Sequence, residues 1–179
     1  MKLTEQLSTP PQQSYRTIPL SRGQVAIVDA GDYDWLIRYS WNARWCKKSE
    51  HFYATRSEYV CHRNGKRIVR TYQMHREILG FKPGDPHVDH VHVDNTLDNR
   101  RENLRSASRS QNKANGHKYS NNTSGYKGVT WSKRKHVWIA RVGVNGKRIH
   151  LGSFHTKEDA HAAYCEAAVR YFGEFARPS

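Results

Sequence analysis

The sequence predicts an α+β protein of 179 residues, rich in short strands and with a helix near its C-terminal end. Two Asn-Gly pairs, Asn64-Gly65 and Asn145-Gly146, each separate two runs typical of strands and therefore predict tight hairpins. Ser108 and Gln111 have the spacing of a capping box, which predicts a helix from Ser108 to about Asn115. The length suits one domain of ordinary size or two small ones.

The first half of the chain predicts short elements separated by turns. Residues 1–14 are polar and contain a Pro-Pro pair, so we expect a loose arm there. Residues 23–28 predict a strand, and a short helix is expected to begin near Asp32 or Asp34. Residues 74–80 predict a second short helix that stops at Gly80. Residues 15–71 are β-rich and give no further assignment.

After a polar linker at residues 117–123, the C-terminal segment predicts a small sheet that packs on one helix. Three strands are expected within residues 126–154, and Thr156 is placed to cap the helix that follows. One narrow face of that helix carries Ala160, Ala163, Tyr164, Ala167, Ala168 and Tyr171. Trp131 and Trp138 are assigned mainly to the core of this segment.

The charge of the chain favours a nucleic-acid partner. The net charge is +14, and no acidic residue occurs from Asn103 through Thr156. Such a positive field attracts polyphosphates. The three cysteines form no C-x-x-C pair, which disfavours a zinc ribbon and a disulfide framework and suits a reducing cytoplasm. We expect no signal peptide and no membrane span.

The stretch "HVDHVHVDNTLDN", from His87 to Asn99, places acids and histidines in the middle of this basic chain. A phosphodiesterase with a single hard cation needs one or two oxygen ligands and a neutral imidazole that accepts a proton from water. Asp89 and His90 supply the first carboxylate and the imidazole. Asn112, in the first turn of the helix after Ser108, is the expected second ligand, and Asn103 is expected to brace the intervening loop.

Other interpretations of this stretch remain open. A polar surface loop would also contain these residue types. His87 and His92 flank the Asp-His pair and favour zinc, for which imidazole is a good ligand. Asp94 and Asp98 are more typical of turns than of ligands. Arg100, Arg101 and Arg105 are candidates either for phosphate contacts or for a solvated basic face.

The segment from about residue 72 to 115 resembles the HNH endonucleases of the ββα-metal type, especially phage and intron homing enzymes. The resemblance is carried by "MHREILG", "VDH", "LDNRRENLR" and "QN". It implies that Asp89 and Asn112 bind a divalent metal, most simply Mg²⁺ with Mn²⁺ as an alternative. It also implies catalytic roles for His90, which activates water, and for Asn103, and a substrate contact or packing role for His75. The segment 91–98 is one residue longer than in many relatives and lacks their glycine.

Residues 124 to about 176 resemble the Apetala-two (ethylene-response-factor) type of DNA-binding domain. The motifs are "GV-x-W", "W-x-A-R-V", "LGSF" and "EDAHAAY-x-EAA", in that order. The resemblance implies a three-stranded antiparallel sheet that enters the major groove of double-stranded DNA. Strand alternation then predicts the DNA-facing residues: Thr130, Ser132, Lys133, Arg134, Arg141, Arg148 and His150.

Together these features predict two parts: a β-rich region with an HNH core at residues 15–116, and a DNA-binding domain at residues 124–179. The expected function is a homing-type DNA endonuclease that makes one nick per site, acts as a monomer or weak dimer, and comes from a phage or its bacterial host. The alternatives are a DNA-binding regulator without cleavage and an RNA-binding protein.

Overall fold

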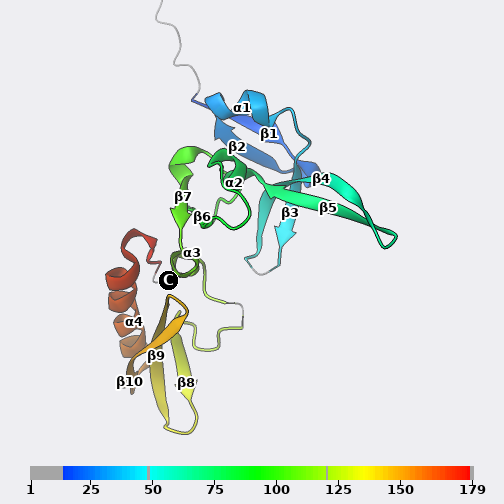
Figure 1. The fold of residues 1–179 in the computed structure, drawn as a ribbon. Coiled ribbons are helices and arrows are strands. Elements are labelled where there is room, and N and C mark those ends of the chain that lie inside the picture. The colour runs from blue at the N-terminus through cyan, green and yellow to red at the C-terminus, as the bar shows by residue number, and fades with distance from the viewer. Residues whose placement is uncertain (1–13, 48, 120, 178–179) are drawn as a thin grey trace, which may run out of the picture.

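The computed structural model describes residues 14–47, 49–119 and 121–177, which fold into four small antiparallel sheets and several helices (Figure 1). Except for Ser14, the predicted arm at residues 1–14 lies outside the described residues. No helix in the described part of the chain is both long and apolar enough to cross a bilayer. The sheets and helices confirm the α+β class in its coarse form, a mixed protein with a C-terminal helix.

The N-terminal part contains two of the sheets. The elements are β1 (Tyr15–Pro19), the 3-10 turn η1 (Ser21–Gly23), β2 (Val25–Asp29), α1 (Ala30–Leu36), β3 (Asn42–Cys46), β4 (His51–Arg63), β5 (Lys66–Gln73) and α2 (Met74–Ile78). β1 pairs with β2, and β4 pairs with both β3 and β5. Their inward side chains, with Val28, Leu36 and Met74 among the most buried, form one hydrophobic core.

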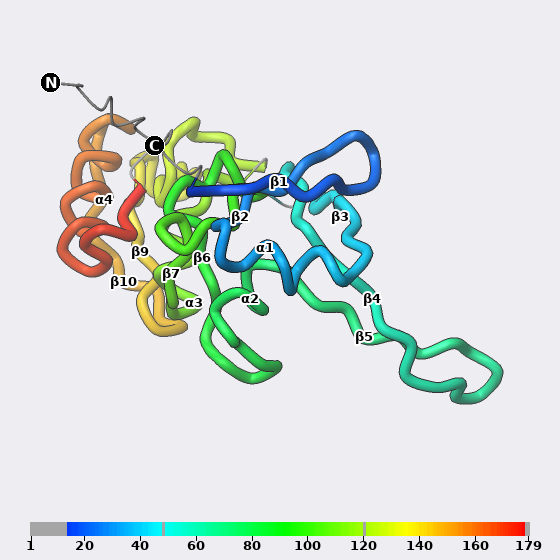
Figure 2. The backbone as a smooth tube through the Cα atoms, turned by 90° about the horizontal axis from the view of Figure 1, so that it is seen from above, coloured from blue at the N-terminus to red at the C-terminus, as the bar shows by residue number. Residues whose placement is uncertain are grey.

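Two expectations for this part have different outcomes. The hairpin at Asn64-Gly65 is confirmed, since both residues have positive φ and join β4 directly to β5. In both Figures 1 and 2 this hairpin extends away from the rest of the molecule. The helix expected to begin at Asp32 or Asp34 begins earlier, at Ala30, because Asp29 occupies the N-cap position. Asp32 lies in the first turn and pairs with Arg101.

A two-stranded antiparallel sheet and a short helix follow α2. β6 (His87–His90) pairs with β7 (Leu104–Ala107), which follows the 3-10 turn η2 (Arg101–Asn103). α3 (Arg109–Asn115) comes next. The predicted capping box is confirmed, because the Ser108 hydroxyl accepts from the Gln111 N–H at 3.2 Å and the Gln111 side chain accepts from the Ser108 N–H at 2.8 Å. Gly116 ends the helix.

The C-terminal part is a three-stranded sheet covered on one face by a long helix. The strands are β8 (Val129–Ser132), β9 (Val137–Val144) and β10 (Lys147–Phe154), in the order β10-β9-β8. The helix α4 (Lys157–Phe172) is capped by Thr156, and the 3-10 turn η3 (Gly173–Phe175) follows it. Ala140 and Val142 of β9 pack against Ala160 and Ala168 of α4, as strand alternation predicts.

Two aromatic residues that were expected to face the core, Trp131 and Tyr171, are exposed. Trp131 is 43% exposed: it shares the face of Trp138, but it lies near the turn on the edge strand β8. Tyr171 is 42% exposed, and Phe172 is buried in its place. The reason is that the last turn of α4 packs on Ala107 and Ala114, outside the sheet, so a different side of the helix is covered there.

The C-terminal part is joined to the rest of the chain by packing and by one half-buried lysine, Lys127. The same apolar cluster contains Ala107 of β7, Ala114 of α3 and Phe172 of α4. The Lys127 ammonium donates to the carbonyl oxygens of Ala114, Gly116 and Arg177. Burial lowers the pKa of Lys127 to about 8. Three carbonyl acceptors compensate for this desolvation and connect the end of α3 to both ends of the C-terminal part.

Gly128 provides a test of this packing. Its φ is +75°, and a Cβ atom there would lie 2.1 Å from Cδ2 of the buried Tyr164 ring. We expect Gly128→Ala to lower the free energy of unfolding by at least about 2 kcal/mol, from backbone strain and overpacking combined. Gly125 has φ +81° but open space around it, so Gly125→Ala should cost only about 1 kcal/mol. Urea unfolding followed by tryptophan fluorescence measures both, and equal losses would contradict the predicted clash.

Candidate functional site

A large cleft of about 1750 Å³ lies between the N-terminal part and the C-terminal sheet. The sequence-predicted residues His75, Asp89, His90 and Asn112 line it, and so do Thr130, Arg141 and Arg148 of the sheet. The structure therefore brings residues that are more than 50 positions apart in the sequence to the walls of one cavity. The cleft contains both the candidate chemical groups and part of the candidate DNA-binding face.

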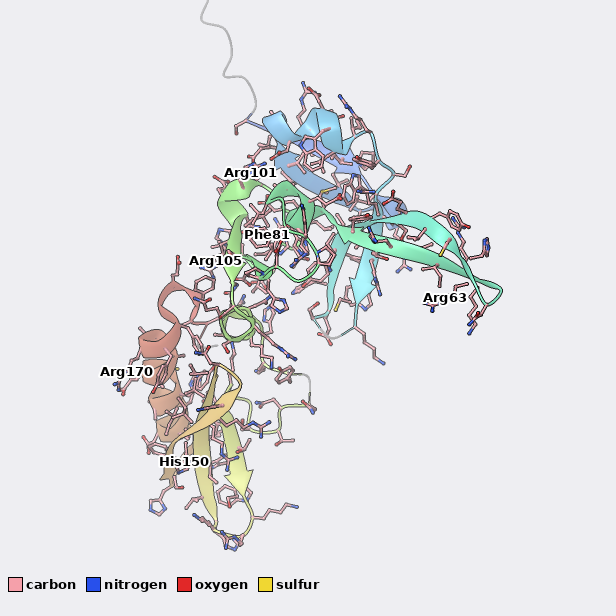
Figure 3. The ribbon with its side chains drawn as sticks, in the orientation of Figure 1. Arg63, Phe81, Arg101, Arg105, His150 and Arg170 are labelled. Atoms are coloured by element: carbon pink, nitrogen blue, oxygen red, sulfur yellow. The ribbon has the colours of Figure 1, made fainter. Side chains whose placement is uncertain are left out.

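Asp89 is a buried carboxylate held by two side chains. Its Oδ2 atom accepts from Arg105 Nε at 3.0 Å and from Asn115 Nδ2 at 3.0 Å. Asn115 also donates to the His90 carbonyl at 2.7 Å, which fixes the end of β6. Burial raises the pKa of Asp89, while the bonds from Asn115 and Arg105 act in the opposite direction. Figure 3 shows Arg105 between β7 and the end of α4.

The amide that contacts Asp89 is not the one that the sequence singled out. Asn112 lies one turn earlier on α3, is half-buried and lines the same cleft. Sequence reasoning missed Asn115, although its position three residues after Asn112 places both amides on one side of the helix. α3 thus carries two carboxamides, that of Asn115 in direct contact with Asp89 and that of Asn112 on the wall of the cleft.

The imidazole of His90 is oriented by a neighbouring amide. Asn99 Nδ2 donates to the Leu97 carbonyl at 3.0 Å, so its oxygen is turned toward His90 Nε2, at 3.4 Å. An amide oxygen only accepts, which places the ring proton on Nε2 and leaves Nδ1 with a free lone pair. Burial lowers the pKa of His90 to about 4, although the Asn99 bond and the charge of Asp98 oppose this. The ring is therefore neutral near pH 7.

Two further rings surround His90. His75 is 5% exposed and lies edge-on to His90, with ring centroids 5.0 Å apart. Tyr53 of β4 lies 6.1 Å from His90 and 6.0 Å from His75. Burial lowers the pKa of His75 well below its usual value, and its Nδ1 atom has no hydrogen-bond partner among the described residues. His75 thus packs against the candidate base. No pattern in the sequence indicates that Tyr53 lies beside it.

Asn103 holds the loop between β6 and β7. Its Oδ1 accepts from the His92 N–H at 2.8 Å, and its Nδ2 donates to the Asp98 carbonyl at 2.8 Å. It is 1% exposed, so the side chain is entirely committed to these backbone groups. These contacts are of the kind expected for a loop brace, and they keep residues 91–98 folded over the end of β6.

The acids and arginines around this loop pair with one another. Arg100 binds the buried Asp98 through two nitrogens, at 2.9 and 2.7 Å. Arg101 binds Asp32 in the same two-pronged way, at 2.8 and 2.9 Å. The interpretation of Asp98 as a simple turn residue is therefore incomplete. Arg100, Arg101 and Arg105 were candidates either for phosphate contacts or for a solvated basic face, and each also forms an ion pair within the fold.

The outer face of the C-terminal sheet presents basic side chains. Arg141 of β9 stands directly opposite His150 of β10, and Arg148 lies two positions away on the same face. All three are exposed, as are Thr130, Lys133 and Arg134, whereas Ser132 is half-buried. α4 covers the opposite face, so these side chains are available to a partner.

Two comparisons with known proteins bear on these features. The AP2 domain family matches residues 124–174, which confirms the predicted Apetala-two-type domain. The chain is also 33% identical to protein 3.8 of Escherichia phage T7 over 84 residues, 47% of this chain and 69% of that protein. The expected phage relative is thereby confirmed. Neither comparison tests the nuclease core, which stays a prediction.

The buried imidazole of His90 gives a pH prediction. Because its folded pKa of about 4 lies below the usual 6.5, the unfolded chain gains a proton first as the pH falls. This group alone should remove about 2 kcal/mol of stability between pH 7 and pH 5. We expect His90→Gln to lose less stability over this range than the wild type in urea unfolding. The exposed His92 provides the control, since His92→Gln should keep the wild-type slope; parallel slopes for all three proteins would contradict the prediction.

Proposed function

The chain belongs to the family of protein 3.8 of Escherichia phage T7, and we propose that this member is a metal-dependent DNA endonuclease whose AP2 domain binds the duplex. The observation that carries the proposal is the shared cleft. The Asp89-His90 pair and the basic face of the AP2 sheet line the same cavity, so DNA on the sheet lies beside a carboxylate and a neutral imidazole. The resemblance of residues 72–115 to HNH endonucleases supplies the reaction, hydrolysis of a phosphodiester.

The residues present fit a hard divalent cation. Asp89 offers a carboxylate and Asn112 a carboxamide, and both line the cleft. Both hydrogen bonds to the Asp89 side chain use Oδ2, which leaves Oδ1 for a cation. Oxygen ligands of this kind suit Mg²⁺ or Mn²⁺, with waters completing the coordination. When bound, the cation would supply charge stabilisation for the phosphate and for the departing oxygen.

The protein side chains then have separate tasks in the proposed reaction. His90 accepts a proton from the attacking water at Nδ1, while Asn99 holds Nε2–H and fixes the ring orientation. Asn103 keeps the loop over β6 in place. His75 and Tyr53 pack around the ring, and this burial keeps the imidazole neutral and able to act as a base.

The AP2 sheet positions the substrate. A two-stranded ribbon fits the major groove, where arginine forms paired hydrogen bonds with guanine edges. Arg141, Arg148 and His150 form the centre of the exposed face, and Lys133 and Arg134 at the adjacent turn are suited to phosphate contacts. Binding to host or phage DNA in the cytoplasm, by a monomer or weak dimer, is part of this proposal.

DNA binding can be tested on the sheet face separately from cleavage. We expect Arg141→Ala and Arg148→Ala each to weaken binding to a target duplex about 10-fold or more, because each removes a base or phosphate contact. Arg170 lies on the side of α4 turned away from the sheet (Figure 3), so Arg170→Ala is the matched control and should bind like the wild type. Fluorescence anisotropy without divalent metal measures all four proteins. Equal affinities would remove the sheet face from the binding site.

Cleavage is tested by plasmid nicking with Mg²⁺. His90→Ala should reduce the nicking rate by about 100-fold or more with binding retained, because a general base is lost. His92→Gln should nick at the wild-type rate, and a chelator should stop the reaction.

A wild-type protein that binds duplex DNA but never nicks it would instead support the non-catalytic regulator. Stronger competition by structured RNA than by duplex DNA would favour the RNA-binding alternative.

A further inference from the structure

Three side chains from distant segments form a cluster that the proposed nuclease mechanism does not use. His51 begins β4, Asp94 lies in the loop after β6, and His117 follows α3. Each offers one ligand atom, and these atoms all lie within 4.8 Å of one another. His117 Nε2 is 2.9 Å from Asp94 Oδ1, and the rings of His51 and His117 are 5.6 Å apart. We propose that this cluster binds a zinc ion.

An ion pair alone does not account for the cluster. Asp94 pairs with His117 on one oxygen and with Arg177 on the other, at 3.0 Å, which would satisfy an ordinary surface carboxylate. His51 takes no part in these two contacts of Asp94. Its Nε2 atom is buried and has no hydrogen-bond partner in the part of the chain that the structure describes. A buried polar atom without a partner costs about 1–3 kcal/mol, and a cation bound to this nitrogen would remove that cost.

The donor set identifies the ion. Two imidazoles and one carboxylate are typical zinc ligands, whereas Mg²⁺ prefers oxygen donors only. Three protein ligands leave a fourth tetrahedral position for water. Arg177 holds the other oxygen of Asp94, the kind of outer contact that orients a ligand carboxylate. This site therefore differs in chemistry from the oxygen pair Asp89 and Asn112.

The proposed zinc ligands differ from the two histidines that flank the Asp-His pair in the sequence. His87 and His92 flank the Asp-His pair in the sequence, but neither belongs to the cluster, and both are exposed. The actual members come from residues 51, 94 and 117, so only the fold brings them together.

A zinc ion here would connect the two parts of the molecule. His51 belongs to the N-terminal sheets, and Asp94 to the loop beside the cleft. His117 is the first residue of the segment that leads to the AP2 domain, and Arg177 lies at that domain's end. The bound ion would fix the AP2 sheet relative to the cleft, whichever reaction the cleft performs.

The test uses the full chain, stripped with a chelator and dialysed. Calorimetric titration with zinc sulfate in excess Mg²⁺ should give one tight site per chain, and zinc should raise the melting temperature. His51→Gln and His117→Gln should each weaken zinc binding by about 100-fold or more, since a lost ligand costs at least as much as a lost outer contact. His92→Gln should bind zinc like the wild type.

The result that overturns the site is equally specific. If both ligand variants bind zinc as the wild type does, or the wild type binds none, the cluster is an Asp94–His117 ion pair only. Circular dichroism without zinc verifies that the variants fold. If His51→Gln fails to fold, His117→Gln still tests the site, because His117 is exposed. The readout is zinc binding and not cleavage. Absence of zinc binding would therefore leave the nuclease proposal intact, and absence of nicking would leave the zinc site intact.

Discussion

The arrangement of the central elements depends on the partners of one buried carboxylate, that of Asp89. Asp89 is 4% exposed on a four-residue strand, and a charge in that position needs partners from other elements. Arg105 comes from the paired strand β7 and Asn115 from helix α3. Arg105 also stacks on the Phe175 ring at 3.7 Å. Asp89 and its partners thereby connect β6, β7, α3 and the end of the C-terminal part.

The loop at residues 91–103 is likewise held by polar side chains that pair with groups of the fold. It has few apolar side chains, so hydrophobic burial alone does not order it. Asp98 binds Arg100, Asn103 binds loop backbone, and the Thr96 hydroxyl donates to the Phe52 carbonyl at 2.5 Å. Backbone bonds to Ile27 at 2.9 and 2.7 Å attach the loop to β2. The unusual density of acids in this stretch is thus explained by internal pairing, which holds the loop beside the candidate base.

The features that the sequence predicted well are those determined by residues close together in the chain. The capping box at Ser108 and the turns at Asn64-Gly65 and Asn145-Gly146 depend on only a few neighbouring residues, and the structure has all three. The strand alternation of the AP2 sheet is likewise local. The partners of the site are different. Tyr53 reaches His90 from 37 positions earlier, and nothing in its neighbouring residues indicates that contact.

Two sets of arginines have different surroundings. Several around the loop, together with Arg56 of β4, form ion pairs with buried or half-buried acids, as in Arg56–Glu77 and Arg101–Asp32. On the AP2 sheet, no acidic side chain among the described residues pairs with Arg141 or Arg148, which stand in a stretch without acids. Their charges are therefore not used to hold the fold, and they remain as a positive field on the cleft wall. In the proposed reaction this field would draw a phosphodiester toward the cleft, where the buried neutral ring of His90 would accept a proton.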